Sequence, residues 1–199
     1  MGVDYVDLYY VHRLDPKMPV EKTMELMTGA KNSIRRAYTV APVDAVQVEY
    51  NPFQLDIENE TGTNLLSACR EFGITVFAYA PLGRGFLTAP TTLRPTIRFS
   101  PANFAKNPVL VNRFKALADK KGCTPGQLAL AWLSAQGEDI MPIPGTKKLK
   151  YMVENVGALK VHLSKVEVQE IRDKVEKAEV VGKRNPLGMF TEYSVTVEL

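Results

Sequence analysis

The amino-acid sequence predicts an α/β fold in which a parallel sheet carries helices on its outside. Four short, mostly apolar and β-prone runs, at residues 6–11, 45–50, 74–80 and 139–144, read as strands. Stretches with helical spacing follow each of them, and such alternation is typical of parallel sheets. Because the runs are nearly continuous in apolar residues, both faces of the sheet are expected to be covered.

The ends of the expected helices carry recognisable signals. Thr124-Pro125-Gly126-Gln127 is typical of a capping box, with Thr as N-cap and Gln three residues later. Gly73 is expected to end one helix, and Ser164 to begin the last long one. We therefore expect helices over 19–27, 30–40, 64–72, 107–120, from 125 onward, 151–159 and 165–179, a long irregular loop over 88–107 and an irregular tail over 183–199.

Composition places the 199 residues, taken as one domain over 1–199, among ordinary globular proteins, with 45% hydrophobic and 24% charged residues. A net charge of +3 is too small to indicate nucleic acid or a membrane surface as a partner. No apolar run approaches the roughly 18 residues of a membrane span. The N-terminus lacks the pattern of a signal peptide, so a cytoplasmic location is expected.

Few side chains are available for a metal site or a disulfide framework. The chain has two cysteines, Cys69 and Cys123, far apart in sequence, and two histidines, His12 and His162. This number excludes a disulfide scaffold and a Cys-rich zinc site, and we expect no metal. Both thiols are predicted to be buried and reduced.

Four motifs carry a family resemblance: GVDYVDLYYVHR at 2–13, VQVEYNPF at 46–53, FAYAPLGRGFLT at 77–88 and IMPIPGTKKLKYMVENVGAL at 140–159. Together, and in this order, they resemble the fourth, sixth, seventh and eighth strands of the NADP-dependent aldo-keto reductase family, in its branch with a PLGRG loop. The resemblance covers most of residues 1–180.

The resemblance implies a TIM-type (β/α)8 barrel, for which about 250 residues are typical. The matched region begins at the fourth strand, and the fifth strand has no counterpart, because 19–27 joins 30–40 directly through Thr28-Gly29. The sequence therefore predicts a partial barrel, with about four parallel strands in chain order and helices outside.

The resemblance also implies an activity, the NADPH-dependent reduction of a small aldehyde or ketone to an alcohol. The family uses an Asp, a Tyr, a Lys and a His, and only the His has a match, His12, which would orient the substrate oxygen. The alternative for His12 is a hydrogen-bonded residue at a strand end. Without the other three, the isolated chain is expected to be impaired as an enzyme.

Residues matched to the family's NADP site form two groups. Gln47 would hold the nicotinamide carboxamide, and Tyr79 would stack under the ring. The segment matched to the pyrophosphate loop is Ala80, Pro81, Leu82, Gly83, Arg84 and Gly85, in which glycine permits close backbone approach. Matched to the adenine end are Thr146, Lys147 and Lys148, at a helix start that favours anions, and the pair Glu154 and Asn155.

Simpler explanations exist for both groups, namely an ordinary turn for the loop and a solvated helix face for the lysines. Tyr151 stands where the family often has an Arg for the 2′-phosphate, which leaves NAD as an alternative to NADP.

Three other functions fit the sequence. In the first alternative, the chain would be a non-catalytic half-barrel that binds a partner. A separate chain, or a second copy of this one, would then complete the barrel through the exposed strand edges and the apolar inner face. In the second alternative, it would be an acid–base isomerase or dehydratase that uses His12 with Asp15, Glu49 or Tyr50. In the third, it would be a truncated gene product. If reductase turnover survived, Tyr50 would be the first candidate for the missing proton donor.

Overall fold

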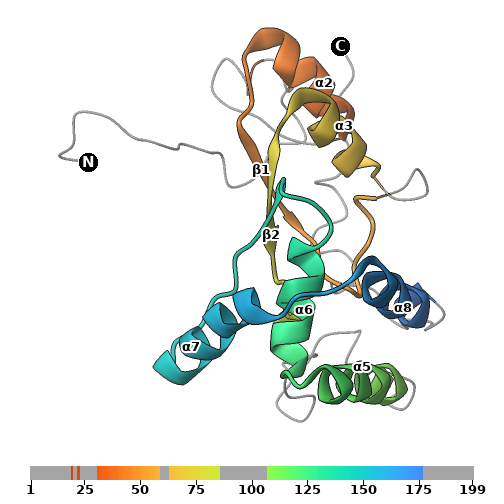
Figure 1. The fold of residues 1–199 in the computed structure, drawn as a ribbon. Coiled ribbons are helices and arrows are strands. Elements are labelled where there is room, and N and C mark those ends of the chain that lie inside the picture. Colours follow the sequence, from red (N-terminus) through yellow and green to blue (C-terminus); the bar gives the residue numbers. More distant parts are fainter. Residues whose placement is uncertain (1–18, 20–21, 23–30, 59–62, 86–106, 177–199) are drawn as a thin grey trace.

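The computed structural model describes residues 19, 22, 31–58, 63–85 and 107–176 (Figure 1). The strand expected at 6–11, the helix expected at 19–27 apart from two of its residues, the loop up to residue 106 and the tail at 183–199 lie outside the described residues.

Three parallel strands make up the sheet in the part of the chain that the structure describes. β1 (Ala45–Glu49) pairs with β2 (Thr75–Tyr79), and β2 pairs with β3 (Ile140–Pro142), in the order β1-β2-β3. This arrangement confirms the parallel pairing and the chain order expected for the last three strands. Val46 lies beside Val76, which lies beside Ile140, so these three side chains share one face.

The helices agree with the sequence expectations to within about two residues at most ends, which is the usual uncertainty of helix boundaries. They are α2 (Lys31–Val40), α3 (Leu65–Phe72), α5 (Asn107–Lys121), α6 (Pro125–Ser134), α7 (Leu149–Gly157) and α8 (Lys165–Glu176), with 3₁₀ turns η1 (Gly83–Gly85) and η4 (Ala158–Lys160).

The predicted caps form as expected. Thr124 Oγ accepts from the N–H of Gln127 at 3.2 Å, and Gln127 Oε1 accepts from the N–H of Thr124 at 3.1 Å. A second reciprocal pair links Ser164 and Glu167 at the start of α8, with bonds of 3.2 and 2.8 Å. Gly73, at φ 69°, ends α3 in the left-handed conformation.

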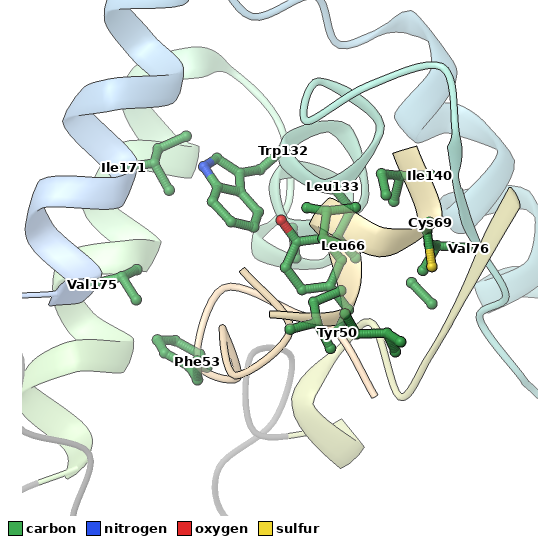
Figure 2. Close-up of a cluster of buried hydrophobic side chains, with 14 of the residues drawn as sticks. Tyr50, Phe53, Leu66, Cys69, Val76, Trp132, Leu133, Ile140, Ile171 and Val175 are labelled. Carbon is green, nitrogen blue, oxygen red and sulfur yellow. The ribbon is translucent and has the colours of Figure 1, made fainter. Parts of the chain in front are cut away.

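α6 lies at the centre of the helical layer and contacts β3, α5 and α7 (Figure 1). Its residues from Leu128 to Leu133 are all buried, and Trp132 and Leu133 have no exposed surface. Figure 2 shows Trp132 and Leu133 in one cluster with Tyr50, which follows β1, and with Ile171 and Val175 from α8. The core therefore lies between the sheet and the helices that follow it.

The two faces of the sheet are buried to different extents, most clearly in β2, so the expectation that both faces are covered was wrong for the described strands. Along β2, Val76 and Ala78 are wholly buried, whereas Phe77 and Tyr79 on the other face are half-buried. Met141, beside Phe77 on that face, is 52% exposed. In a barrel this face points inward, and here the three described strands leave it partly open.

The packing of α6 predicts a large difference between two leucine substitutions. Leu133→Ala is expected to lower the free energy of unfolding by about 2–5 kcal/mol, because it leaves a cavity in a core that packs closely. Leu159→Ala is the matched control, since Leu159 is 75% exposed, and it should cost less than about 0.5 kcal/mol. Urea denaturation followed by circular dichroism measures both, and equal losses would contradict the assigned core.

Candidate functional site

The loops that leave the carboxyl ends of β1 and β2 lie together. The N–H of Tyr50 donates to the carbonyl of Tyr79 at 3.4 Å, and Asn51 Nδ2 donates to the carbonyl of Ala80 at 3.2 Å. Ligands of parallel α/β sheets bind beyond this edge, so it is the natural place for a site.

Gln47 and Tyr79 lie on the same face of the sheet. Gln47 pairs with Phe77, and Tyr79 lies two residues further along β2, so both face the partly open side. Gln47 is exposed and Tyr79 is half-buried. An amide and an aromatic ring thus lie on the same face of the sheet at this edge.

The segment 80–85 forms two tight turns in which three residues are left-handed. Ala80 has φ 50°, Gly83 φ 56° and Gly85 φ 91°. The N–H of Gly83 donates to the carbonyl of Ala80 at 2.9 Å, and that of Gly85 to Leu82 at 3.1 Å. Pro81 is buried, and a Cβ at Gly85 would meet no atom within 4 Å, so the loop is anchored on one side and open on the other.

The second group surrounds the start of α7. Thr146, Lys147 and Lys148 are exposed, and Thr146 Oγ accepts from the N–H of Lys148 at 3.2 Å. Lys148 is the N-cap and makes no side-chain cap bond. The positive end of the helix dipole and these ammonium groups favour an anion here, but they do not by themselves define a binding site.

Glu154 and Asn155 diverge from each other. Glu154 Oε1 accepts from Thr124 Oγ at 2.7 Å, and its carbonyl accepts from Gln127 Nε2 at 3.1 Å, so it joins α7 to the capping box of α6. Asn155 instead lines a cavity of about 520 Å³ between α6, β3 and α7, together with Thr146. The same cavity is also lined by Ala131, Pro142, Met152, Val156 and His162.

His12 and the side chain of Arg84 lie outside what the structure describes. Among the described residues, no three His, Cys, Asp or Glu side chains cluster in a way that could hold a metal ion. A search of the same residues finds no helix with the length and apolarity to cross a membrane.

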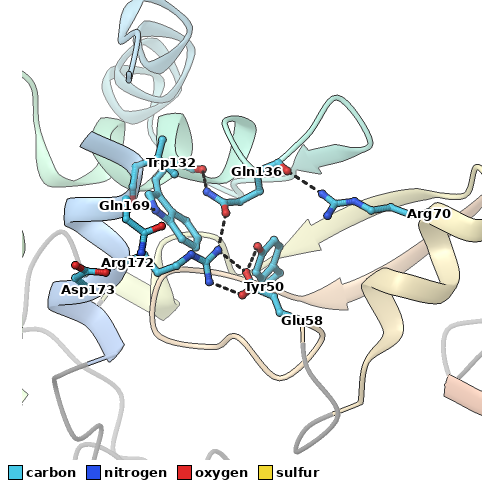
Figure 3. Close-up of polar contacts among 9 residues, drawn as sticks. Tyr50, Glu58, Arg70, Trp132, Gln136, Gln169, Arg172 and Asp173 are labelled. Carbon is cyan, nitrogen blue, oxygen red and sulfur yellow. Dashed lines mark hydrogen bonds and ion pairs between the residues drawn. The ribbon is translucent and has the colours of Figure 1, made fainter. Parts of the chain in front are cut away.

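Tyr50 faces away from this site, into the core. Its ring is fully buried and meets Trp132 edge-on at 6.1 Å, and its hydroxyl donates to Glu58 (Figure 3). Burial, and then the Glu58 carboxylate, raises the pKa of Tyr50 far above its usual range. The expectation that Tyr50 could serve as a proton donor to substrate was therefore wrong, and the isomerase alternative loses this residue.

Arg172 of α8 completes a partly buried polar cluster, which the sequence alone did not indicate. Its guanidinium binds both carboxylate oxygens of Glu58, donates to Gln136 Oε1 at 2.7 Å and lies 5.2 Å from the centre of the Trp132 ring (Figure 3). The cluster fixes the loop after β1, which begins at Tyr50 and includes Glu58, against α6 and α8.

Comparison with known families identifies the fold. A model described as the Aldo/keto reductase family matches residues 1–176. The chain belongs to the aldo/keto reductase family. Aldo-keto reductase yakc (NADP+) of Schizosaccharomyces pombe is 48% identical over 214 aligned positions, covering 94% of this chain and 62% of the relative. Aldo-keto reductase str7 of Strobilurus tenacellus is 43% identical, with 93% and 62% coverage.

Solved structures of aldo-keto reductases share the arrangement. A thermostable aldo-keto reductase crystallised with the inhibitor epalrestat is 26% identical, with a TM-score of 0.67 over 86% of this chain and 60% of the other. Glycerol dehydrogenase from Gluconobacter oxydans is 23% identical, with a TM-score of 0.74 over 91% and 62%. The likeness to these barrels confirms the partial-barrel interpretation.

The chain spans about three fifths of the length of the curated relatives it matches. About 187 residues, 94% of 199, occupy an alignment of 214 positions with the S. pombe reductase, so about 27 positions of that relative have no counterpart here. This difference agrees with an internal gap in this chain, whose position the alignment length does not give.

The cluster around Arg172 predicts a large loss of stability when its charge is removed. Arg172→Met should lower the free energy of unfolding by about 3–5 kcal/mol, because it leaves the largely buried Glu58 carboxylate without its cation. Lys174→Met, which breaks the more exposed pair with Glu170 on the same helix, should cost about 0.5 kcal/mol or less. Urea unfolding of both variants measures the difference, and similar losses would refute the role given to Arg172.

Proposed function

We propose that this chain forms the dinucleotide-binding part of an NADP-dependent aldo-keto reductase, an oxidoreductase acting on a small aldehyde or ketone. The observation that carries the proposal is that Gln47 and Tyr79 lie on one face of the sheet and that loop 80–85, with its left-handed residues, follows Tyr79 directly. The name of the S. pombe relative, which includes NADP+, and a Klebsiella pneumoniae aldo-keto reductase crystallised with NADPH support the choice of cofactor.

The residues of this edge suit the nicotinamide half of NADPH. When bound, the cofactor would supply a hydride. Gln47 has an exposed amide that can both donate to and accept from a carboxamide, and the aromatic ring of Tyr79 lies on the same face of the sheet, where a flat heterocycle would stack. The open side of Gly85 leaves room for the pyrophosphate to approach the backbone.

The start of α7 suits the adenosine half. Thr146, Lys147 and Lys148 present a hydroxyl and two ammonium groups beside a helix N-terminus. Lys150 Nζ lies 4.7 Å from the centre of the Tyr151 ring, which adds a cation where the family often has an Arg. This positive charge favours NADP over NAD, and Asn155 is the residue of the matched pair that borders a cavity able to receive a base.

Reductase turnover is a separate matter from binding. His12 would orient the substrate carbonyl, but no position of these 199 residues matches the family's Asp, Tyr and Lys. Loss of such a constellation removes proton transfer, typically worth about 10²–10⁴-fold in rate, and also hydride positioning. The isolated chain is therefore proposed to bind the dinucleotide weakly and not to turn over aldehydes. The free thiols Cys69 and Cys123 agree with a cytosolic setting.

A second candidate function is that of a half-barrel subunit that associates with a copy of itself or with a complementing chain. The partly open face of the sheet favours it, as does the apolar surface of α7, where Leu149, Met152, Val153 and Val156 are all exposed. Apolar patches of this kind usually mark interfaces.

Glycine substitution in the loop tests the dinucleotide site. Gly83→Asp places a carboxylate beside the proposed pyrophosphate and should raise the Kd for NADPH about tenfold or more through like-charge repulsion. Gly122→Asp is the matched control, because Gly122 is also left-handed, at φ 72°, and ends α5. His12→Ala should leave the Kd nearly unchanged.

The Kd values come from titration of NADPH fluorescence or from calorimetry. No detectable binding by the unaltered chain would refute the dinucleotide site. Equal effects of the two aspartates would refute the role of loop 80–85. Robust NADPH oxidation with simple aldehydes would overturn the proposal that the isolated chain does not turn over.

The exposed face of α7 predicts self-association at micromolar concentration. Light scattering coupled to size exclusion should give a dimer or larger species. Val153→Glu, at a position 64% exposed on α7, should shift it toward monomer. Val166→Glu, at a position 78% exposed on α8, should not. A monomer in every sample would contradict the association.

A further inference from the structure

Ala80 has a backbone conformation that its side chain disfavours. Its φ of 50° lies in the left-handed region, where the Cβ of an L-residue crowds the following carbonyl. Among the described residues other than glycine, only Asn64 shares a positive φ. Ala80 is also the first residue of loop 80–85, so its conformation sets the direction in which the loop leaves β2.

The carbonyl of Ala80 is held by two donors. The N–H of Gly83 reaches it at 2.9 Å from within the loop, and Asn51 Nδ2 reaches it at 3.2 Å from the end of β1. A carbonyl oxygen has two lone pairs, so these two bonds use its full capacity. The first bond belongs to the turn, whereas the second comes from a residue 29 positions away in the sequence.

Asn51 is itself fixed before it reaches Ala80. Its side chain is 2% exposed, and Oδ1 accepts from the N–H of Phe53 at 3.0 Å. Its backbone forms a turn with Gln54, with bonds of 2.9 and 3.4 Å. The amide group therefore has one orientation in which its oxygen holds its own turn and its nitrogen points at Ala80.

We propose that Asn51 is a positioning residue that holds Ala80 in the left-handed conformation and thereby sets loop 80–85 for the dinucleotide. This inference rests on the proposed function for its ligand, but not for the clamp itself. Without the bond from Nδ2, Ala80 relaxes to an ordinary conformation, and the loop reaches its binding geometry in only a fraction of molecules. The apparent affinity is then reduced to that fraction of its intrinsic value.

A serine at position 51 keeps one of the two hydrogen bonds of the Asn51 side chain and removes the other. Asn51→Ser keeps a hydroxyl that can accept from the N–H of Phe53, as serine does in similar turns, but it is too short to reach Ala80. Ala80→Gly removes the steric penalty at its origin, because glycine adopts a positive φ freely. A double variant therefore tests whether the two positions act through one conformation. Asn112→Ser, at an exposed position of α5, controls for the substitution.

The first measurement needs no ligand. The backbone carbon shifts and the three-bond HN–Hα coupling of Ala80 report its φ by NMR. They should indicate a left-handed residue in the unaltered chain and in Asn112→Ser, and an ordinary conformation in Asn51→Ser. A left-handed Ala80 that persists in Asn51→Ser overturns the proposal. This result stands whether or not NADPH binds, so failure of the clamp and failure of the proposed function are distinguishable.

The second measurement is the Kd for NADPH. Asn51→Ser should raise it about five- to thirtyfold, the factor that corresponds to the usual penalty of a left-handed alanine. Asn51→Ser/Ala80→Gly should return to within about threefold of Ala80→Gly alone. A merely structural role for the turn at 51–54 would give no rescue by glycine at position 80, and that result overturns the proposal.

Folding of each variant is checked by circular dichroism. If Asn51→Ser does not fold but the double variant does, the rescue supports the clamp. If neither folds, Asn51 supports the whole domain rather than Ala80, and the proposal is overturned.

Discussion

The packing of α6 between the sheet and the helices α5 and α8 is the constraint on which the other features depend. This helix is buried around its circumference from Leu128 to Leu133, as expected for a helix surrounded by protein. Burial of a Leu or a comparable apolar side chain contributes about 1.5–3 kcal/mol, so the segment supplies a large share of the driving force. It also contacts β3, which pairs with β2, and loop 80–85 begins at the end of β2.

A partly buried polar cluster links this packing to the candidate site. Trp132 of α6 lies against the guanidinium of Arg172, which holds Glu58, whose carboxylate accepts from the hydroxyl of Tyr50. Each group is satisfied by the next, which offsets the cost of removing the charges from water. Because Asn51 follows Tyr50 directly, the same cluster places the side chain that reaches Ala80.

Local sequence signals predicted the helices and strands. Contacts between residues distant in the sequence determined which strand face is buried and how the loops are held, and these features were not predicted. The capping box at Thr124 and the glycine stop at Gly73 were correct because both depend on a few neighbouring residues. One-sided burial of β2 was missed, since an apolar run such as 75–79 looks the same with one face covered or two. Tyr50 could have been placed correctly by strand parity, because a period of two from Gln47 puts it on the opposite face. The bond from Asn51 had no sequence signal beyond an Asn before a Pro.

The proposed dinucleotide site and the proposed loss of turnover depend on different parts of the barrel. The conformation of loop 80–85 follows from contacts within the described residues, namely the turn bonds, the amide of Asn51 and the buried Pro81. None of these contacts needs the partly open face of the sheet to be covered. In the proposed function, in contrast, proton transfer to a carbonyl would use the family's Asp, Tyr and Lys, for which this chain offers no matched residue. A segment that spans about three fifths of its relatives thus holds loop 80–85 in an ordered conformation through its own contacts, whereas the proposed reductase chemistry would need further strands to complete the barrel.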